Sequence, residues 1–243
     1  MGVLDGKVAI VTGSNRGIGR GIARGFARAG ASLALAARDA ALLEDAADEF
    51  RGLGAQVAAI PTDVTDEETV DALIAGTLER FGQLDVLVNN AGIAEHAPLV
   101  DMTLEAWQRT VDVNLTGPFL CARAALRVMA AGGRGRIINV ASISSQRVRP
   151  GSASYSATKF GLWGLTQVIA LEGREHGVSC SCLNPGNTWV ERRTGTERRE
   201  DDEPMMTVDE LATAAVTMAA MPDHVNMLEA TVLPVGQPFI GRG

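Results

Sequence analysis

Cysteine is scarce in this chain, and the few that occur form no metal-binding pattern. The three cysteines are Cys121, Cys180 and Cys182, an odd number. Cys180 and Cys182 alternate within an apolar run and have no partner ligands at the spacing of a zinc site. We interpret all three as small buried residues in a reducing compartment, and we expect a cytoplasmic location and no metal.

Long apolar runs and an excess of positive charge are also missing. No apolar run reaches the length that spans a bilayer, and residues 1–11 lack the charged segment that opens a signal peptide. The net charge is −7 and the isoelectric point is near 5.0. Because such a chain repels nucleic acid and anionic lipid, we expect neither as a partner.

The chain does contain a regular alternation of predicted strands and predicted helices. Hydrophobic residues make up 46% of its 243 residues, enough for a substantial core. Apolar runs rich in β-branched residues predict strands at 7–13, 32–38, 56–64, 84–92, 135–142, 178–185 and 229–235. The longer segments between them predict helices at 16–29, 39–54, 66–82, 103–131, 152–176 and 207–221.

This alternation predicts an α/β fold. Successive strand–helix–strand units connect through right-handed crossovers, which give a parallel sheet with helices on both faces. No linker rich in Pro, Gly and Ser and no internal repeat interrupts the pattern. We predict a single doubly wound, Rossmann-like domain over residues 1–243, with about seven strands.

The first predicted strand runs directly into a glycine-rich segment, TGSNRGIG at residues 12–19. Glycines in such a turn let the backbone approach a pyrophosphate, and the following helix offers unpaired N–H groups and the positive end of its dipole. A tight turn that binds nothing is the alternative for this segment alone. Its position after the first strand of an α/β chain favours a dinucleotide site.

Tyr155 is the only tyrosine of the chain, and Lys159 follows it by four residues. In the predicted helix 152–176 this spacing puts both side chains on one face. A free phenol has a pKa of about 10, and a nearby ammonium group favours its ionised form. The pair therefore has the chemistry of an acid for reduction of a carbonyl, or of a base for the reverse reaction. A solvated surface pair is the alternative.

In their order along the chain, these motifs resemble the short-chain dehydrogenase/reductase family. The resemblance covers nearly the whole chain and rests on residues 12–19, Asp63–Val64, Asn89–Gly92, Asn114, Ser142, Tyr155, Lys159 and Pro185–Gly186. It implies an enzyme that interconverts a ketone and a secondary alcohol by hydride transfer with a nicotinamide cofactor. It also implies a small-molecule substrate and a homo-oligomer, either a dimer or a tetramer.

The resemblance gives roles to four catalytic residues. Tyr155 would be the acid or base, and Ser142 would hold the substrate oxygen, a choice over Ser144 and Ser145 that rests on the family's spacing. Lys159 would tune the phenol and hold the ribose of the cofactor. Asn114 would anchor a water, because Pro118 has no N–H and deprives the carbonyl of residue 114 of its helical partner.

These roles imply a route for the proton. We predict a path from Tyr155 through a ribose hydroxyl and Lys159 to water at Asn114. A simple bend in the helix is the alternative reading of Asn114.

The same resemblance supplies the expected cofactor contacts. They are Gly13, Asn15, Arg16, Gly17, Ile18, Gly19, Arg38, Asp63, Val64, Asn90, Ala91, Gly92, Tyr155, Lys159, Pro185, Gly186 and Thr188.

The choice of cofactor can be argued from charge. No acid precedes Asp39 at the end of the second predicted strand, whereas Arg38 and Arg16 supply guanidinium groups that suit a 2′-phosphate. We predict NADP(H), with NAD(H) as the alternative because Asp39 is close by.

The charged segment 188–206 is predicted to be a mobile lid over the substrate, with a solvated loop as the alternative. Four side chains are candidates for lining the substrate pocket, although each is more often a plain loop or packing residue. They are His96, Gln146, Trp189 and Arg192.

Two other functions stay open. A 3-oxoacyl-(acyl carrier protein) reductase would need basic residues for an acidic carrier, and Glu95, Asp101 and the net charge oppose this. A non-catalytic dinucleotide-sensing module would not require Tyr155 together with Lys159.

Overall fold

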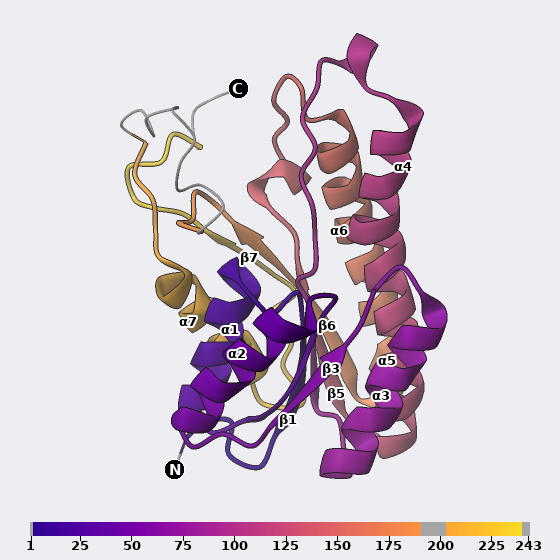
Figure 1. Ribbon diagram of the computed structural model, residues 1–243, viewed down its shortest axis with the longest axis vertical. Coiled ribbons are helices and arrows are strands. Elements are labelled where there is room, and N and C mark those ends of the chain that lie inside the picture. The colour runs from indigo at the N-terminus through magenta and orange to yellow at the C-terminus, as the bar shows by residue number, and fades with distance from the viewer. Residues whose placement is uncertain (1, 191–202, 240–243) are drawn as a thin grey trace.

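The computed structural model describes residues 2–190 and 203–239, and these form one parallel sheet covered by helices on both faces (Figure 1). The sheet has seven strands in the order β3-β2-β1-β4-β5-β6-β7, and every pairing is parallel. The strands are β1 (Val8–Thr12), β2 (Ser32–Ala37), β3 (Val57–Pro61), β4 (Val86–Asn89), β5 (Gly135–Val140), β6 (Val178–Pro185) and β7 (Glu229–Val232). The predicted doubly wound single domain is confirmed.

The helices form a layer on each face of the sheet, as Figure 1 shows. One layer consists of α1 (Gly17–Arg28), α2 (Ala40–Gly52) and α7 (Val208–Ala219). The other contains α3 (Glu67–Phe81), α4 (Leu104–Val111), α5 (Gly117–Gly132) and α6 (Ala153–Gly173). Short 3-10 turns occur at Leu99–Asp101, Ile143–Ser145 and Arg174–His176.

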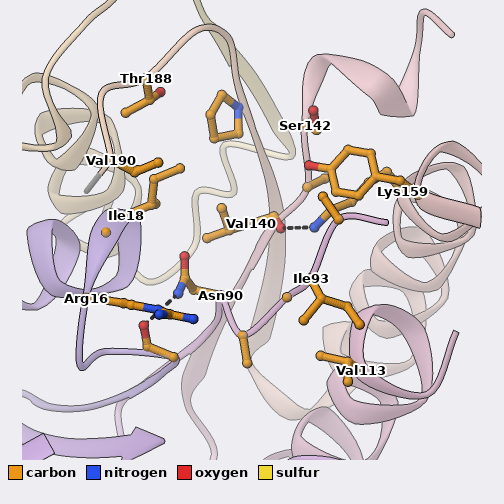
Figure 2. A pocket seen from close by; sticks show the side chains of 18 of the residues that line it. Arg16, Ile18, Asn90, Ile93, Val113, Val140, Ser142, Lys159, Thr188 and Val190 are labelled. Carbon is orange, nitrogen blue, oxygen red and sulfur yellow. Dashed lines mark hydrogen bonds between the residues drawn. The ribbon is translucent and has the colours of Figure 1, made fainter. Parts of the chain in front are cut away.

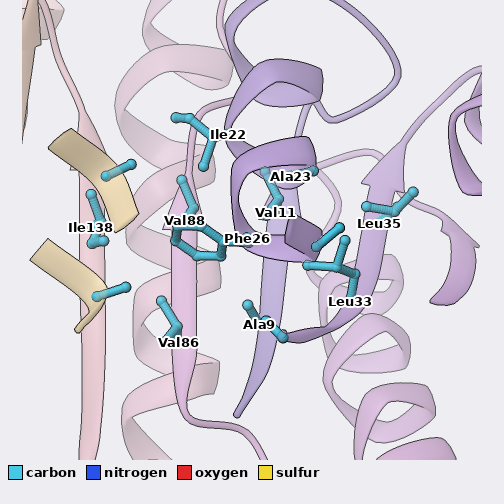
Figure 3. Close-up of a cluster of buried hydrophobic side chains, with 14 of the residues drawn as sticks. Ala9, Val11, Ile22, Ala23, Phe26, Leu33, Leu35, Val86, Val88 and Ile138 are labelled. Carbon is cyan, nitrogen blue, oxygen red and sulfur yellow. The ribbon is translucent and has the colours of Figure 1, made fainter. Parts of the chain in front are cut away.

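The alternation of side chains along β1 divides the core into these two layers. All five residues of β1 are buried, as expected for a strand covered on both faces. Ala9 and Val11 face the α1 layer, whereas Ile10 faces α3 and α5. On the α1 side of the sheet, Phe26 extends from α1 and packs beside Val88 (Figure 3). Burial of such a side chain contributes about 1.5–3 kcal/mol.

Polar side chains mark the starts of several helices. Asp39 accepts a hydrogen bond from the Leu42 N–H at 3.0 Å and so caps α2. Thr207 and Glu210 form a reciprocal capping box at the start of α7.

The segment predicted as one long helix over 103–131 is interrupted at its centre. A π-helical turn, Asp112–Thr116, separates α4 from α5, and the Gly117 N–H bonds to the Asp112 carbonyl. The interruption falls just before Pro118, which has no N–H to continue the α-helical ladder. The interruption is therefore a widened turn inside a nearly continuous helix.

All three cysteines are buried and unpaired. Burial raises the pKa of the Cys121 thiol to about 12, so this thiol is a packing residue and not a nucleophile. Among the described residues, no helix combines the length and the apolar character needed to cross a membrane.

The strand order reverses direction at β1, which lies between β2 and β4. In open α/β sheets the loops after the strands part at such a point and leave a crevice at the carboxyl edge. The loops that follow β1, β4, β5 and β6 all reach this edge.

Candidate active site

The loop between β1 and α1 is a compact backbone turn. Gly13 and Gly17 have φ values of 65° and 56°, in the left-handed region that favours glycine. A Cβ atom at Gly19 would lie 2.3 Å from the Gly13 carbonyl oxygen. Glycine at this position therefore lets the first turn of α1 pack directly on the loop.

Thr12 and Asn90 join this turn to the loop after β4. The Thr12 Oγ1 atom accepts hydrogen bonds from the N–H groups of Asn90 and Ala91, both at 3.0 Å. The Asn90 side chain in turn donates to the carbonyls of Thr12 at 2.9 Å and Gly13 at 3.2 Å. The two loops are thus held together across the point where the strand order reverses.

A cavity of about 560 Å³ lies at this edge of the sheet. Figure 2 shows Arg16, Ile18 and Asn90 toward one end of it, and Ser142 and Lys159 toward the other. Most of the residues predicted from the sequence line this one cavity: Gly13, Asn15, Arg16, Gly17, Ile18, Arg38, Asp63, Val64, Asn90, Ala91, Gly92, Ser142, Tyr155, Lys159, Pro185, Gly186 and Thr188. Among the residues predicted for catalysis or cofactor contact, Gly19 and Asn114 do not line it.

Arg38 and two acids lie together at the glycine-turn end. The Arg38 side chain is 73% exposed, and its Nη1 atom is 3.9 Å from Asp63 Oδ2. Such an exposed pair contributes at most about 1 kcal/mol, so it leaves the guanidinium group available to an anion. The Asp39 carboxylate is hydrogen-bonded to the first turn of α2.

Lys159 is buried beside Tyr155 on α6, as the four-residue spacing predicts. Its Nζ atom lies 5.6 Å from the centre of the Tyr155 ring. The same atom donates a 2.9 Å hydrogen bond to the Val140 carbonyl at the end of β5 (Figure 2). Lys159 is only 5% exposed, and it forms no ion pair among residues 2–190 and 203–239. Its side chain lines the cavity, and Nζ forms no second hydrogen bond with the described residues.

Ser142 begins the 3-10 turn after β5. Its Oγ atom accepts a hydrogen bond from the Ser144 N–H at 3.1 Å, which leaves the hydroxyl proton available for donation. Ser145 is directed elsewhere, because its Oγ atom contacts the Ser142 carbonyl and Asn184 Oδ1, at 2.7 and 2.8 Å. Ser142 and Ser144 line the cavity, whereas Ser145 does not.

The Asn114 side chain lies behind the cavity wall. Its amide exchanges two hydrogen bonds with the Ile93 backbone, each 2.8 Å long, and is 3.4 Å from Thr158 Oγ1. Asn114 thereby connects the loop after β4 with the residue that precedes Lys159. The water-holding role of its carbonyl stays a prediction.

The segment predicted to be a lid is described only at its two ends. Trp189 N–H bonds to the Met206 carbonyl at 2.8 Å, and Met206 N–H bonds to the Asn187 carbonyl at 3.0 Å. Residues 191–202, including the candidate Arg192, lie outside the described residues. Thr188, an expected cofactor contact, lines the cavity.

Several cavity residues were not identified from the sequence. The Val140 carbonyl that holds Lys159 is a backbone group and has no side-chain signature. Arg149 and Ser152 also line the cavity, and they lie in a loop where no periodicity points to a site. His96, a candidate from the sequence, lines it as well, whereas Gln146 instead contacts Glu229.

Comparison with known proteins places this chain in a family. The family described as short chain dehydrogenase matches residues 7–201. This chain is a short-chain dehydrogenase/reductase. An uncharacterized oxidoreductase of Staphylococcus aureus (strain USA300) is 36% identical over 235 residues, covering 97% of this chain and all of that protein.

Two further relatives of this dehydrogenase carry more specific descriptions. A 3-oxoacyl-[acyl-carrier-protein] reductase of Synechocystis (strain ATCC 27184 / PCC 6803 / Kazusa) is 40% identical over 187 residues, 76% of each chain. The crystal structure of a metagenomic short-chain oxidoreductase in complex with NADP superimposes with a TM-score of 0.84 at 33% identity, covering 96% of this chain and 98% of that one. The chain is thus an oxidoreductase of a family whose members bind NAD or NADP.

Proposed function

We propose that this dehydrogenase interconverts a ketone and a secondary alcohol with NADP(H), through Ser142, Tyr155, Lys159 and Asn114. The observation that carries the proposal is the position of Lys159 beside Tyr155 in one cavity with the glycine turn. One end of that cavity suits a dinucleotide, and the other holds an acid–base pair.

The glycine-turn end fits a nicotinamide dinucleotide. Its backbone is so closely packed that a Cβ atom at Gly13 would lie 2.9 Å from the Ala91 Cα atom. The Arg16 side chain, at the N-cap of α1, forms no capping hydrogen bond, so the start of the helix can face a pyrophosphate. When bound, the cofactor would supply or accept the hydride. Asp63, Val64 and Asn90 would line its adenosine portion, and Thr188 would lie near its far end.

Preference for NADP(H) rests on the charges near Arg38. Arg16 and Arg38 both line the cavity, and a 2′-phosphate would accept hydrogen bonds from their guanidinium groups. Asp39, the acid that favoured NAD(H), is engaged as the N-cap of α2. The relative that was crystallised with NADP supports the same choice.

Tyr155 would donate its hydroxyl proton to the substrate oxygen in reduction and accept it in oxidation. The positive charge of Lys159 would stabilise the negative charge that forms on the phenol oxygen. The free hydroxyl proton of Ser142 would bond the same substrate oxygen and fix its direction. Asn114 would position the Lys159 turn of α6 through Thr158.

Replacement of Tyr155 by Phe tests this assignment. The variant should bind NADPH with wild-type affinity, measured by nucleotide fluorescence, yet lose at least about 100-fold in kcat/KM for ketone reduction. Reduction at a rate comparable to wild type would show that the assignment of roles is wrong. A dinucleotide-sensing module, in contrast, would bind NADPH in the wild-type form and reduce no ketone in a broad panel.

A 3-oxoacyl-(acyl carrier protein) reductase is the second candidate, and the relative from Synechocystis favours it. The net charge of −7 opposes it, because an acidic carrier is repelled, whereas Glu95 is paired with Arg109 and so adds little to that repulsion. A carrier-linked 3-oxoacyl thioester, compared with a free small ketone, separates the two. Higher kcat/KM for the carrier-linked substrate would favour the second candidate.

We also infer a homo-oligomer in the cytoplasm. Apolar side chains are exposed along α5 and α6, where the family resemblance predicts the contact between copies: Phe119, Phe160, Val168 and Leu171. Light scattering measures the mass directly, and a monomer would contradict this inference. The unpaired cysteines support a reducing compartment.

A further inference from the structure

The catalytic end of the cavity carries two basic side chains that the roles above do not use. His96 lies in the loop after β4, with its ring centre 6.2 Å from that of Tyr155. Arg149 lies in the loop before α6 and lines the same cavity. Both side chains line the cavity that Tyr155 also lines.

The two loops that carry these side chains are fixed to each other. The Ala97 N–H, next to His96, donates a 3.1 Å hydrogen bond to the Gly151 carbonyl, two residues beyond Arg149. The Ser152 hydroxyl donates to the Arg149 carbonyl at 2.6 Å and is 2.8 Å from Ser156 Oγ on α6. The Arg149 backbone is therefore anchored to the first turns of the helix that carries Tyr155.

The positive charge of Arg149 has no acidic partner in the part of the chain that the structure describes. No ion pair within residues 2–190 and 203–239 includes Arg149. The acids among the described lining residues are Asp39 and Asp63, which lie at the glycine-turn end beside Arg38. Glu95, the acid next to His96, is held by Arg109 in two hydrogen bonds of 2.7 and 2.9 Å.

Arg147, in the same loop, provides a contrast. Its guanidinium carbon lies 5.8 Å from the centre of the Phe239 ring, and its side chain does not line the cavity. Arg147 is therefore a natural control for charge in the loop as a whole.

From this arrangement we propose that the enzyme acts on substrates that carry a carboxylate near the reacting carbon, namely oxo acids and the corresponding hydroxy acids. Arg149 would bind the carboxylate, since a guanidinium group pairs with two carboxylate oxygens at once. His96 would border the same group from the opposite loop. The chain has a net charge of −7, which repels an anion at long range, so a local cation is needed to retain one. This inference rests on the proposed oxidoreductase function.

Matched pairs of acids and esters test the proposal. NADPH-dependent reduction of 2-oxobutanoate and 5-oxohexanoate is compared with that of their methyl esters, which keep the ketone and remove the charge. We expect wild-type kcat/KM to favour the acid by about tenfold in at least one pair. Arg149→Ala should lower that acid-to-ester ratio about tenfold, mainly through KM, and Arg149→Lys should restore part of it. Arg147→Ala should leave the ratio unchanged.

The outcomes separate this inference from the function on which it rests. Esters that are reduced as well as their acids in every pair would overturn the carboxylate proposal and leave the ketone reductase standing. An unchanged ratio in Arg149→Ala, or an equal loss in Arg147→Ala, would remove Arg149 as the binding group. Failure of all four compounds, with NADPH still bound, would count against the oxidoreductase proposal itself. Calorimetry with the unreactive pair hexanoate and hexanamide adds a readout without turnover, and equal binding of the two would overturn the carboxylate proposal.

Discussion

The ammonium group of Lys159 lies 5.6 Å from the centre of the Tyr155 ring, and a backbone carbonyl, that of Val140, holds it there. A buried lysine commonly pairs with an acid, which would cancel its field. Here a neutral carbonyl orients the cation and leaves its charge directed at the phenol and the cavity. The Val140 carbonyl at the end of β5 thus fixes the position of the positive charge that Lys159 carries on α6.

Replacement of Lys159 by Met should therefore abolish activity while sparing the fold. The substitution removes the charge beside Tyr155, and we expect kcat/KM to fall by about 100-fold or more. Among the described residues no carboxylate loses its partner, and the unbonded Val140 carbonyl costs about 1–3 kcal/mol. Steady-state kinetics and a thermal melt measure both effects. Activity within a few-fold of wild type would contradict the electrostatic role.

Arg38 should determine the choice between NADPH and NADH. Arg38→Ala removes a charge-assisted contact to a 2′-phosphate, so NADPH affinity should fall by about tenfold or more. NADH affinity should stay unchanged because its ribose has no such phosphate. Arg80→Ala is the matched control, since Arg80 stacks on Phe81 and does not line the cavity. Equal affinities for the two nucleotides in wild type and Arg38→Ala would dismiss the guanidinium argument.

Gly19 should tolerate no side chain although it does not line the cavity. Its Cβ atom would lie 2.3 Å from both the Gly13 carbonyl oxygen and Asn90 Nδ2, so Gly19→Ala must displace the turn. We expect a loss of about 1–3 kcal/mol in the free energy of unfolding, together with weaker binding of NADPH. Gly52→Ala, at the end of α2 with no atom within 4 Å of its Cβ position, should be neutral or slightly stabilising. Equal stabilities of the two variants in urea unfolding would refute the packing argument.

Lowering the pH should weaken the contact between α1 and its neighbouring helices. Burial raises the pKa of Glu49, but hydrogen bonds from Arg24 and Arg20 outweigh burial and hold the pKa below its usual value. Because the folded-state pKa is depressed, this stabilisation is complete above the unfolded pKa of about 4.3 and is lost as the pH falls through the folded value.

The variant Glu49→Gln measures this contribution. It should be less stable than wild type by about 1 kcal/mol at pH 7, and the difference should shrink toward pH 3. Urea unfolding at both pH values provides the comparison. A difference that is the same at the two pH values would mean that the ion pairs are not its source.

Much of the site follows from local patterns in the sequence. The four-residue spacing of Tyr155 and Lys159 puts them on one helical face, and the glycines at 12–19 mark the turn after β1. The order of strands and helices also predicts the reversal point where the cavity forms. These features can be predicted from the sequence because helical and strand periodicities involve only a few neighbouring residues.

Other features of the site could not be predicted from local sequence patterns. Asn90 was expected to line the adenosine side, and it also bonds the glycine turn through the Thr12 and Gly13 carbonyls. Gly19 was expected to contact the cofactor, which stays a prediction, and the structure adds that its lack of a side chain lets α1 pack on the turn. The expected continuous helix over 103–131 contains a π turn, because the missing N–H of Pro118 can be accommodated in more than one way.

The sequence alone determined the family, the order of strands and helices, and the pairing of a phenol with an ammonium group on one helix. Tertiary structure decided what holds that ammonium group, which loop locks the glycine turn, and that Arg149 and His96 border the same cavity. These contacts join residues far apart in the chain, such as Asn90 and Thr12, 78 positions apart. The crossover connections bring these partners together, because they place the ends of distant strands at one edge of the sheet. A pattern that repeats over a few residues carries no information about such long-range contacts.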